Sequence, residues 1–347
     1  MSLDHYRLLG RSGLKVSPLV LGAMTFGEVW GADEDTSRRI FDHYVAQGGN
    51  FIDTAGYYAH GRSEELTGQF AAQKRDQLVL STKYSLAVEP GDPNAAGNSR
   101  KTMVRSVEDS LKRLRTDYID LLFLHVWDGR VPADEILRAF DDLIRQGKVL
   151  YIGISDTPAW QVSRLQVMAE LRGWTQFAAM QAEYNLIERT SERDMLPCAR
   201  EMGIGVMPWS PLANGILSGK YASNAAKADE PDGGRREVME KSGRVNPRSI
   251  AIADAVAAVA ARLGVTSAQV ALAWTMQHEA VVAPLIGART LAQLEDNLGS
   301  LDVKLDAEAL TALEQASAIE LGFPHAFLGY EFVQAGLSAG TVVEPRR

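Results

Sequence analysis

The alternation of short apolar runs with longer segments of helical period constrains the fold of this chain more than any other feature. Eight runs have this character: residues 19–21, 51–52, 78–80, 119–124, 149–154, 177–180, 204–207 and 281–286. Between two of them, Met103, Val107, Leu111 and Leu114 lie on one face of an expected helix. Strands that alternate with helices about every 30 residues predict an α/β chain folded as a (β/α)8 TIM barrel.

The order of the segments predicts a single domain over residues 1–347. Residues 5–17 predict an N-terminal β-hairpin, residues from about 18 to 302 the barrel, and residues 303–347 a C-terminal tail. A doubly wound dinucleotide-binding sheet is a poorer interpretation, because no Gly-x-Gly-x-x-Gly motif follows the first apolar run.

Side chains that can cap a helix predict where several helices begin. Ser99 and Thr36 occupy positions typical of N-caps, and Thr266 with Gln269 predicts a capping box. In each case a side-chain oxygen can accept a hydrogen bond from a backbone N–H that has no partner within the helix.

Three segments exceed ordinary loop lengths. Residues 85–99 and 222–247 should leave the C-terminal ends of strands, where long loops usually serve binding, although 222–247 is equally well interpreted as solvated surface. The tail from residue 320 carries Phe323, Phe327, Tyr330 and Phe332. These aromatic side chains are expected either to anchor the tail in the core or to form the wall of a substrate pocket.

The charge balance argues against two classes of partner. The chain has 36 Lys and Arg against 44 Asp and Glu, a net charge of −8, with no basic block of the kind that nucleic acid or an anionic membrane requires. Its single cysteine, Cys198, cannot form an internal disulfide. No secretion signal and no long uncharged apolar stretch is recognisable, so we expect a cytoplasmic protein.

Polar residues follow successive apolar runs at a regular spacing. They are Asp53, Lys83, His125, Ser155, Gln181 and Trp209, separated by 30, 42, 30, 26 and 28 residues. Because the strands of a barrel all end at one mouth, residues this far apart in sequence should converge there.

Three of these side chains, together with Tyr58, suit proton transfer to a carbonyl oxygen. Tyr58 is a poor acid by itself, with a reference pKa of about 10, but a nearby Lys83 ammonium would stabilise its phenolate. Asp53 would hold Lys83, and His125 would donate a hydrogen bond to the substrate oxygen. The set requires no nucleophile or metal and therefore suits hydride transfer from a nicotinamide.

Each residue also has a structural interpretation. A strand-end Asp is often a cap or an ion-pair partner, a Tyr can simply pack, and a lone His is more often a satisfied core group than a catalyst. A metal site is not expected, because the six histidines are scattered and show no His-x-x-x-His spacing.

Several motifs, in the same order, make the chain resemble the aldo-keto reductase superfamily from about Tyr6 to about Asn297. They are Phe51-Ile-Asp-Thr-Ala-Gly-Tyr-Tyr58, Gly61-Arg-Ser-Glu-Glu65, Ser81-Thr-Lys83, Leu124-His125, Gly153-Ile-Ser155, Gln181-x-Glu-Tyr-Asn185, Trp209-Ser-Pro-Leu212 and Gly287-Ala-Arg-Thr290. Segments 91–98, 125–128 and 155–160 look like the aryl-alcohol dehydrogenase branch.

The resemblance implies an NADPH-dependent barrel reductase that converts aldehydes or ketones, aromatic aldehydes first, to alcohols. Its catalytic residues here would be Asp53, Tyr58, Lys83 and His125, with Tyr58 as general acid. The family's spacing of five residues from Asp to Tyr selects Tyr58 over Tyr57.

The resemblance also implies where NADP(H) binds. The nicotinamide carboxamide would lie near Ser155, Asp156 and Gln181, with its ring stacked on Trp209. The diphosphate would run along Ser210, Pro211, Leu212, Gly215 and Leu217. The adenosine end would lie on Gly287, Arg289, Gln293, Asp296 and Asn297, where the Arg289 guanidinium suits a 2′-phosphate and so favours NADPH over NADH.

Two positions depart from the family's pattern. Asp156 stands where many members have Asn, and a carboxylate accepts hydrogen bonds without donating them. Ala213 replaces a glycine that is common in the cofactor loop.

Two other functions stay open. Lys83 could attack a carbonyl and form a Schiff base, as in a lyase, although a paired ammonium is a weak nucleophile. The chain could also be a nicotinamide-binding regulatory subunit with little turnover. The physiological substrate, the favoured direction and the oligomeric state do not follow from the sequence.

Overall fold

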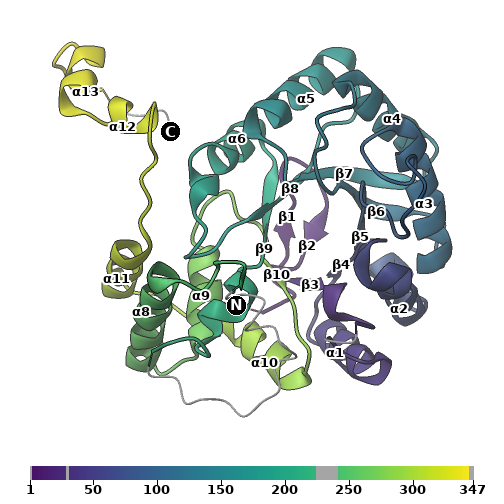
Figure 1. Cartoon of the computed structure of the whole chain (residues 1–347), viewed down its shortest axis with the longest axis horizontal. Coiled ribbons are helices and arrows are strands. Elements are labelled where there is room, and N and C mark those ends of the chain that lie inside the picture. Colours follow the sequence, from purple (N-terminus) through teal and green to yellow (C-terminus); the bar gives the residue numbers. More distant parts are fainter. Residues whose placement is uncertain (1, 29–30, 224–240, 344–347) are drawn as a thin grey trace.

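The computed structural model describes residues 2–28, 31–223 and 241–343, and it has the predicted (β/α)8 barrel (Figure 1). The strands of the parallel sheet are β3 (Val20–Gly22), β4 (Phe51–Asp53), β5 (Val79–Tyr84), β6 (Ile119–Leu124), β7 (Val149–Ser155), β8 (Ala179–Glu183), β9 (Gly205–Trp209) and β10 (Leu285–Ile286). Each of the eight predicted runs overlaps one of these strands, so the fold prediction is confirmed.

The sheet closes between its last two strands. In sequence order β3 to β9 pair with their neighbours, and β10 pairs with β3. An isolated parallel bridge joins Val206 to Val281, where the Val206 N–H donates to Ala280 at 2.9 Å and the Val282 N–H donates to Val206 at 2.8 Å. Closure removes the free edges that an open sheet would expose.

Helices surround the strands on the outside (Figure 1). They are α1 (Glu34–Ala46), α2 (Arg62–Ala71), α3 (Arg100–Leu114), α4 (Ala133–Arg145), α5 (Ala159–Arg172), α6 (Met195–Met202), α8 (Pro247–Leu263), α9 (Ser267–Thr275), α10 (Leu291–Gly299) and α11 (Ala307–Ser317). No single described helix is long and apolar enough to cross a membrane; α8 and α9 meet that test only together, across a 103° bend.

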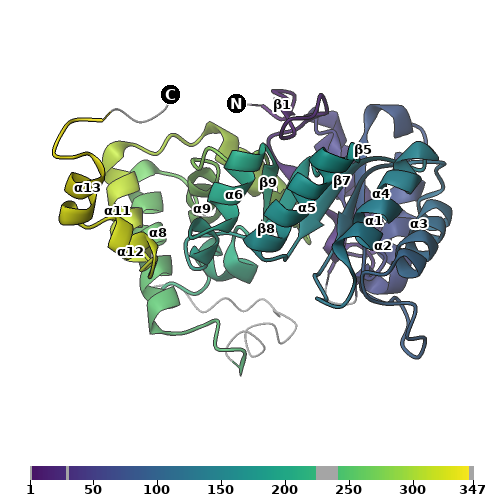
Figure 2. The same ribbon diagram turned by 90° about the horizontal axis from the view of Figure 1, so that it is seen from above.

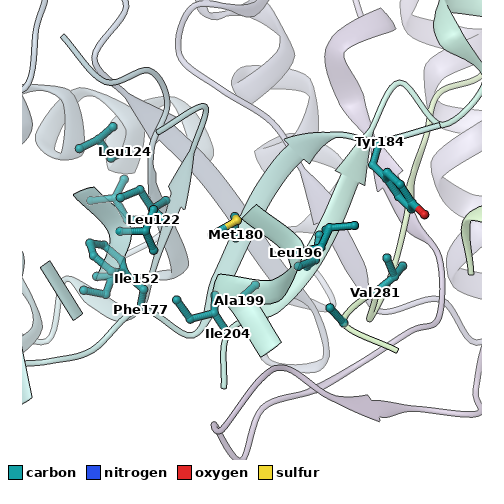
Figure 3. Close-up of a cluster of buried hydrophobic side chains, with 14 of the residues drawn as sticks. Leu122, Leu124, Ile152, Phe177, Met180, Tyr184, Leu196, Ala199, Ile204 and Val281 are labelled. Carbon is teal, nitrogen blue, oxygen red and sulfur yellow. The ribbon is translucent and has the colours of Figure 1, made fainter. Parts of the chain in front are cut away.

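Alternation along each strand separates two apolar layers. Leu122, Ile152 and Met180 point outward and pack with Leu196 of α6 and other side chains of the helix layer (Figure 3). The neighbouring strand positions, such as Phe123, point into the barrel. Because successive side chains of a strand face opposite sides, a continuous apolar run is what a strand buried on both sides requires.

The N-terminal hairpin consists of β1 (Arg7–Leu8) and β2 (Lys15–Val16), as predicted. Leu9 and Val16 are fully buried and belong to the same cluster as Phe51 and other inward-facing strand residues. Phe51 lies at the start of β4, so the hairpin covers the N-terminal end of the barrel and leaves the opposite end for the site.

Two of the three predicted helix starts are confirmed. Ser99 caps α3 by accepting from Thr102, and Thr266 forms the capping box of α9 with Gln269. The Thr36 prediction is wrong. Asp33 caps α1 instead, because its carboxylate accepts from the backbone N–H of Thr36, which lies in the first turn.

Neither expectation for the tail aromatics holds. Beyond α11 the chain forms α12 (His325–Leu328) and α13 (Glu331–Leu337), which stand apart from the barrel in Figure 1 and lie at the α8 and α11 side of the molecule, away from the strands, in Figure 2. The side chains of Phe323, Phe327 and Phe332 are exposed and pack with Tyr330 into a cluster of their own. They neither enter the core nor line the main cavity described below.

The predictions for the two long loops have different outcomes. Residues 85–99 form a loop after β5 whose Val88 carbonyl lies 3.3 Å from the imidazole Nδ1 of His60, but none of them lines the main cavity. Most of segment 222–247 lies outside the described residues, so its predicted place over the barrel mouth stays a prediction.

Candidate active site

Asp53 and Lys83 form a buried ion pair at the C-terminal end of the barrel. Asp53 ends β4, and β5 carries Ser81 and Lys83 toward the same interior because alternate residues share a face. The Lys83 ammonium lies 2.5 Å from the Asp53 carboxylate and donates a second hydrogen bond to the Thr54 carbonyl at 2.8 Å. Both side chains are 1% exposed, so each charge needs the other.

Two further donors complete the surroundings of Asp53. Its second carboxylate oxygen accepts from the Ser81 hydroxyl at 2.6 Å and from the Gln181 amide at 2.7 Å. Three donors from β5 and β8 therefore fix this carboxylate, which in turn fixes the ammonium of Lys83.

Tyr58 and His125 lie against this pair. The Lys83 ammonium is 4.8 Å from the centre of the Tyr58 ring, and the Tyr58 and His125 rings meet edge to face with centroids 5.9 Å apart. Tyr58 lines the cavity next to them, whereas the side chain of Tyr57 is 54% exposed. The geometry therefore groups Tyr58, and not Tyr57, with the other three residues.

The surroundings set the protonation states of these groups. Burial raises the pKa of the Tyr58 phenol; Lys83 acts in the opposite direction, as predicted, but does not outweigh burial. Burial acts to lower the pKa of Lys83, yet Asp53 and Tyr58 outweigh it and the pKa is raised. Burial and the charge of Lys83 lower the pKa of His125 to about 3. At neutral pH the site holds an ammonium, a phenol and a neutral imidazole.

The loop that carries Tyr58 has an unusual backbone. Ala59, His60 and Gly61 follow Tyr58 with φ of 48°, 52° and 89°, all in the left-handed region that costs energy for residues other than glycine. The Ala59 N–H donates to the Glu28 carboxylate at 3.0 Å, and the side chain of Arg113 packs against Gly61.

Arg113 is held in turn by a buried carboxylate. Glu64 is fully buried in α2 and accepts from Arg113 at 2.6 Å and from the Thr82 hydroxyl at 2.6 Å. The contacts of Glu28, Glu64 and Arg113 around the Tyr58 loop were not predictable from the sequence, because they depend on how distant segments pack.

A cavity of about 580 Å³, which we call the main cavity, extends from these groups across the barrel mouth. It is lined by Asp53, Tyr58 and His125 and by all the predicted cofactor residues except Leu217, namely Ser155, Asp156, Gln181, Trp209, Ser210, Pro211, Leu212, Gly215, Gly287, Arg289, Gln293, Asp296 and Asn297. The Leu217 side chain is fully buried in the core between the barrel and its helices.

Comparison with known proteins identifies the family. The sequence model of the "Aldo/keto reductase family" matches residues 18–318. The chain belongs to this family. The aldo-keto reductase ausK of Aspergillus calidoustus is 36% identical over 99% of this chain and 89% of its own length.

Two other relatives have more specific names. Norsolorinic acid reductase B of Dothistroma septosporum is 37% identical over 93% of this chain and 84% of its own length. An aryl-alcohol dehydrogenase [NADP(+)] of Phanerodontia chrysosporium is 36% identical over 94% of this chain and 89% of its own length. The chain is therefore an oxidoreductase that acts on carbonyl or alcohol groups.

The cavity of this aldo-keto reductase fits a nicotinamide dinucleotide by the chemistry of its two ends. At one end Trp209 offers an aromatic face close to the proton-transfer groups. At the other, α10 directs its N-terminal N–H groups, capped by Thr290, beside the Arg289 side chain, an arrangement that suits phosphate. The Arg289 N–H donates to the Gln293 amide oxygen at 2.9 Å, which ties the loop to the helix.

The remaining residues at that end of the reductase are held by their neighbours. The Asn297 amide donates to the Gly287 carbonyl at 3.2 Å. The Asp296 carboxylate accepts from Thr266 at 2.8 Å and from Gln269 at 3.0 Å, so it joins α9 to α10.

The departure at Ala213 has a visible backbone consequence. Ser210, Ala213, Asn214 and Gly215 all have positive φ, and that of Ala213 is 48°, a conformation that glycine adopts without cost. Ala213 therefore occupies a conformation that glycine would adopt at lower cost.

The main cavity also contains residues that sequence reasoning missed. They are Gly22, Met24, Thr25, Ser218, Lys220, Tyr221, Ala268, Leu285 and Ile286, whereas Asn214 and Ala288 lie within the predicted cofactor segments 210–217 and 287–297. Lys220 and Tyr221 follow the cofactor loop directly, and this proximity was the one available signal for them.

Proposed function

We propose that this protein is an NADPH-dependent reductase of aldehydes or ketones in which Tyr58 protonates the substrate oxygen. The observation that carries the proposal is the grouping of Tyr58, Lys83, Asp53 and His125 beside a cavity of about 580 Å³ that Trp209 and Arg289 also line. A nicotinamide, when bound, supplies the hydride.

Each of the four side chains has its own role in the proton transfer to the substrate oxygen. Tyr58 keeps its proton at neutral pH because burial raises its pKa, and it donates that proton as negative charge develops on the substrate oxygen. The Lys83 ammonium stabilises the resulting phenolate, and Asp53 keeps the ammonium in place. His125, a neutral imidazole, donates a hydrogen bond to the same oxygen and orients the carbonyl.

We also propose a preference for NADPH and for aromatic substrates. The guanidinium of Arg289, beside the N-terminus of α10, suits a 2′-phosphate, which it can bind bidentately. A relative whose name includes NADP(+) supports this choice, and the name of the same relative, an aryl-alcohol dehydrogenase, supports an aromatic substrate.

The Schiff-base alternative has little support. A Lys that attacks a carbonyl must be neutral, whereas Lys83 has a raised pKa and donates to both Asp53 and Thr54.

The test is the loss of nicotinamide absorbance when the protein is mixed with NADPH, or NADH in parallel, and a panel of aromatic and aliphatic aldehydes. We expect turnover with NADPH, faster on the aromatic members. Binding of NADPH without turnover of any carbonyl would contradict the proposal and favour a regulatory subunit.

A further inference from the structure

A carboxylate that the proposed mechanism does not use lies at the reacting end of the main cavity. Asp156 directly follows β7 and lines the cavity with Tyr58 and His125. Its backbone N–H donates to the Gln181 carbonyl at 3.3 Å, and the Gln181 side chain donates to Asp53. Asp156 is therefore connected to the proton-transfer groups and not to the phosphate-binding end.

The backbone and a hydrogen bond hold the Asp156 side chain in place. Its φ of 43° lies in the left-handed region, which a non-glycine residue adopts only where surrounding contacts compensate the cost. The Trp209 indole N–H donates to one carboxylate oxygen at 3.0 Å. Because an indole can only donate, this acceptor also fixes the orientation of the Trp209 ring.

The Asp156 charge acts on the reacting groups. The residue is exposed to the open cavity, yet enough protein surrounds its carboxyl for burial to raise its pKa, and Glu183 acts in the same direction. The hydrogen bond from Trp209 and the charge of Lys83 act to lower the pKa of Asp156 and so favour the carboxylate. The carboxylate in turn raises the pKa of Tyr58. The nicotinamide ring must lie close to Tyr58 to exchange a hydride with a substrate bound there. The electric field of the Asp156 carboxylate therefore acts on that ring as well.

Hydride transfer changes the charge of that ring. The C–H bond of the dihydronicotinamide breaks with its electron pair, a C–H bond forms at the carbonyl carbon, and the Tyr58 proton moves to the oxygen. The substrate is reduced, and the neutral nicotinamide is oxidised to a cation.

We propose that Asp156 lets the site distinguish the two redox states of the cofactor by stabilising the cationic ring of NADP⁺ over the neutral ring of NADPH. This inference rests on the proposed function. Its consequence is that the bound cofactor is a stronger hydride donor than it would be beside a neutral amide, so the equilibrium on the protein shifts toward the alcohol.

The test compares the Kd values of NADP⁺ and NADPH for the unmodified protein and for Asp156→Asn, by fluorescence titration at pH 8, about four pH units above the ordinary Asp pKa. Asn keeps the size of the side chain and an oxygen that can accept from Trp209. We expect the ratio Kd(NADP⁺)/Kd(NADPH) to rise roughly two- to fivefold in the variant, the range for a partly exposed charge interaction.

Glu188→Gln is the matched control. Glu188 and Asp156 both line a second, smaller hollow, but Glu188 does not line the main cavity. Its replacement removes one negative charge near Asp156, and the ratio Kd(NADP⁺)/Kd(NADPH) should stay unchanged. The affinity for 2′,5′-ADP, which lacks the nicotinamide, should be equal in all three proteins.

The outcomes separate the two proposals. Three results would overturn this inference and leave the proposed function standing. They are an unchanged Kd ratio in Asp156→Asn, an equal rise of the ratio in Glu188→Gln, and an equal loss of affinity for NADP⁺, NADPH and 2′,5′-ADP in Asp156→Asn. Failure of the unmodified protein to bind either dinucleotide would instead overturn the proposed function.

Discussion

The charges at individual residues explain how the site is prepared for proton donation. Lys83 keeps its proton in spite of burial because Asp53 pairs with it. Burial, and after it the charge of Lys83, lowers the pKa of His125 to about 3. The imidazole is therefore neutral at neutral pH, and the Lys83 ammonium can stabilise a phenolate at Tyr58.

The shifted pKa of His125 predicts how stability depends on pH. In the unfolded chain the imidazole takes up a proton near pH 6.5, but in the folded chain only near pH 3. Between these values the unfolded state binds more protons, so the free energy of unfolding decreases as the pH falls. Urea denaturation at roughly pH 7 and pH 4 should show that the unmodified protein loses about 2–3 kcal/mol more than His125→Gln. An equal loss in both would contradict the pKa assignment.

At this scale the sequence predicted which residue types meet but not their protonation. The strand-end positions of Asp53, Lys83 and His125 were sufficient to expect one cluster, since parallel strands end together. The net direction of the Tyr58 shift was not predictable, because desolvation depends on loops that pack around the phenol.

Among the elements, the short loop after β4 depends most on its neighbours. Three successive residues with positive φ carry the chain from Tyr58 into α2, and Arg113 of α3 packs against that turn. The buried Glu64 carboxylate holds Arg113. The ion pair between α2 and α3 therefore supports the position of Tyr58.

Glu64→Gln should separate this support from the chemistry. Loss of the buried charge leaves Arg113 without its ionic partner, so we expect the free energy of unfolding to fall by about 3 kcal/mol. We also expect kcat to decrease more than the affinity for NADPH, since the proposed cofactor-binding residues lie on β7 to β9 and on later segments, away from α2. Glu65→Gln, at the adjacent and half-exposed ion pair with Arg62, is the control and should change both quantities little. Equal effects of the two changes would contradict the role of Glu64.

The sequence predicted the presence of the strands better than the residues at which the helices begin. All eight strands of the parallel sheet overlap apolar runs, because a strand buried on both sides is composed mainly of apolar residues. The start of α1 was misplaced because Asp33 and Thr36 are both good caps, and the choice between them depends on backbone geometry. The tail aromatics were misjudged because aromatic composition does not say whether a segment reaches the barrel.

At the level of the whole molecule, the two ends of the barrel have different roles. The hairpin closes the N-terminal end, and the main cavity opens at the other. Up to residue 343, the last that the structure describes, the tail beyond α11 contributes to neither end, and its aromatic side chains pack with one another.

Removal of residues 322–347 should therefore leave kcat/KM and the midpoint of thermal unfolding nearly unchanged. Removal of residues 303–347 is the contrasting variant. It deletes α11, whose Ala309 and Leu313 are buried in the core with α8, and should lower the midpoint by many degrees. A large loss of activity in the shorter deletion would show that the tail takes part in turnover.

The most direct measurement of the central claim is the turnover of an aromatic aldehyde with NADPH by Tyr58→Phe, compared with the unmodified protein and with Tyr57→Phe. If Tyr58 is the proton donor, kcat should fall by about 10²–10⁴-fold in Tyr58→Phe, while the Kd for NADPH stays the same. Tyr57→Phe should keep nearly full activity, because that side chain is exposed. Undiminished turnover in Tyr58→Phe would contradict the account.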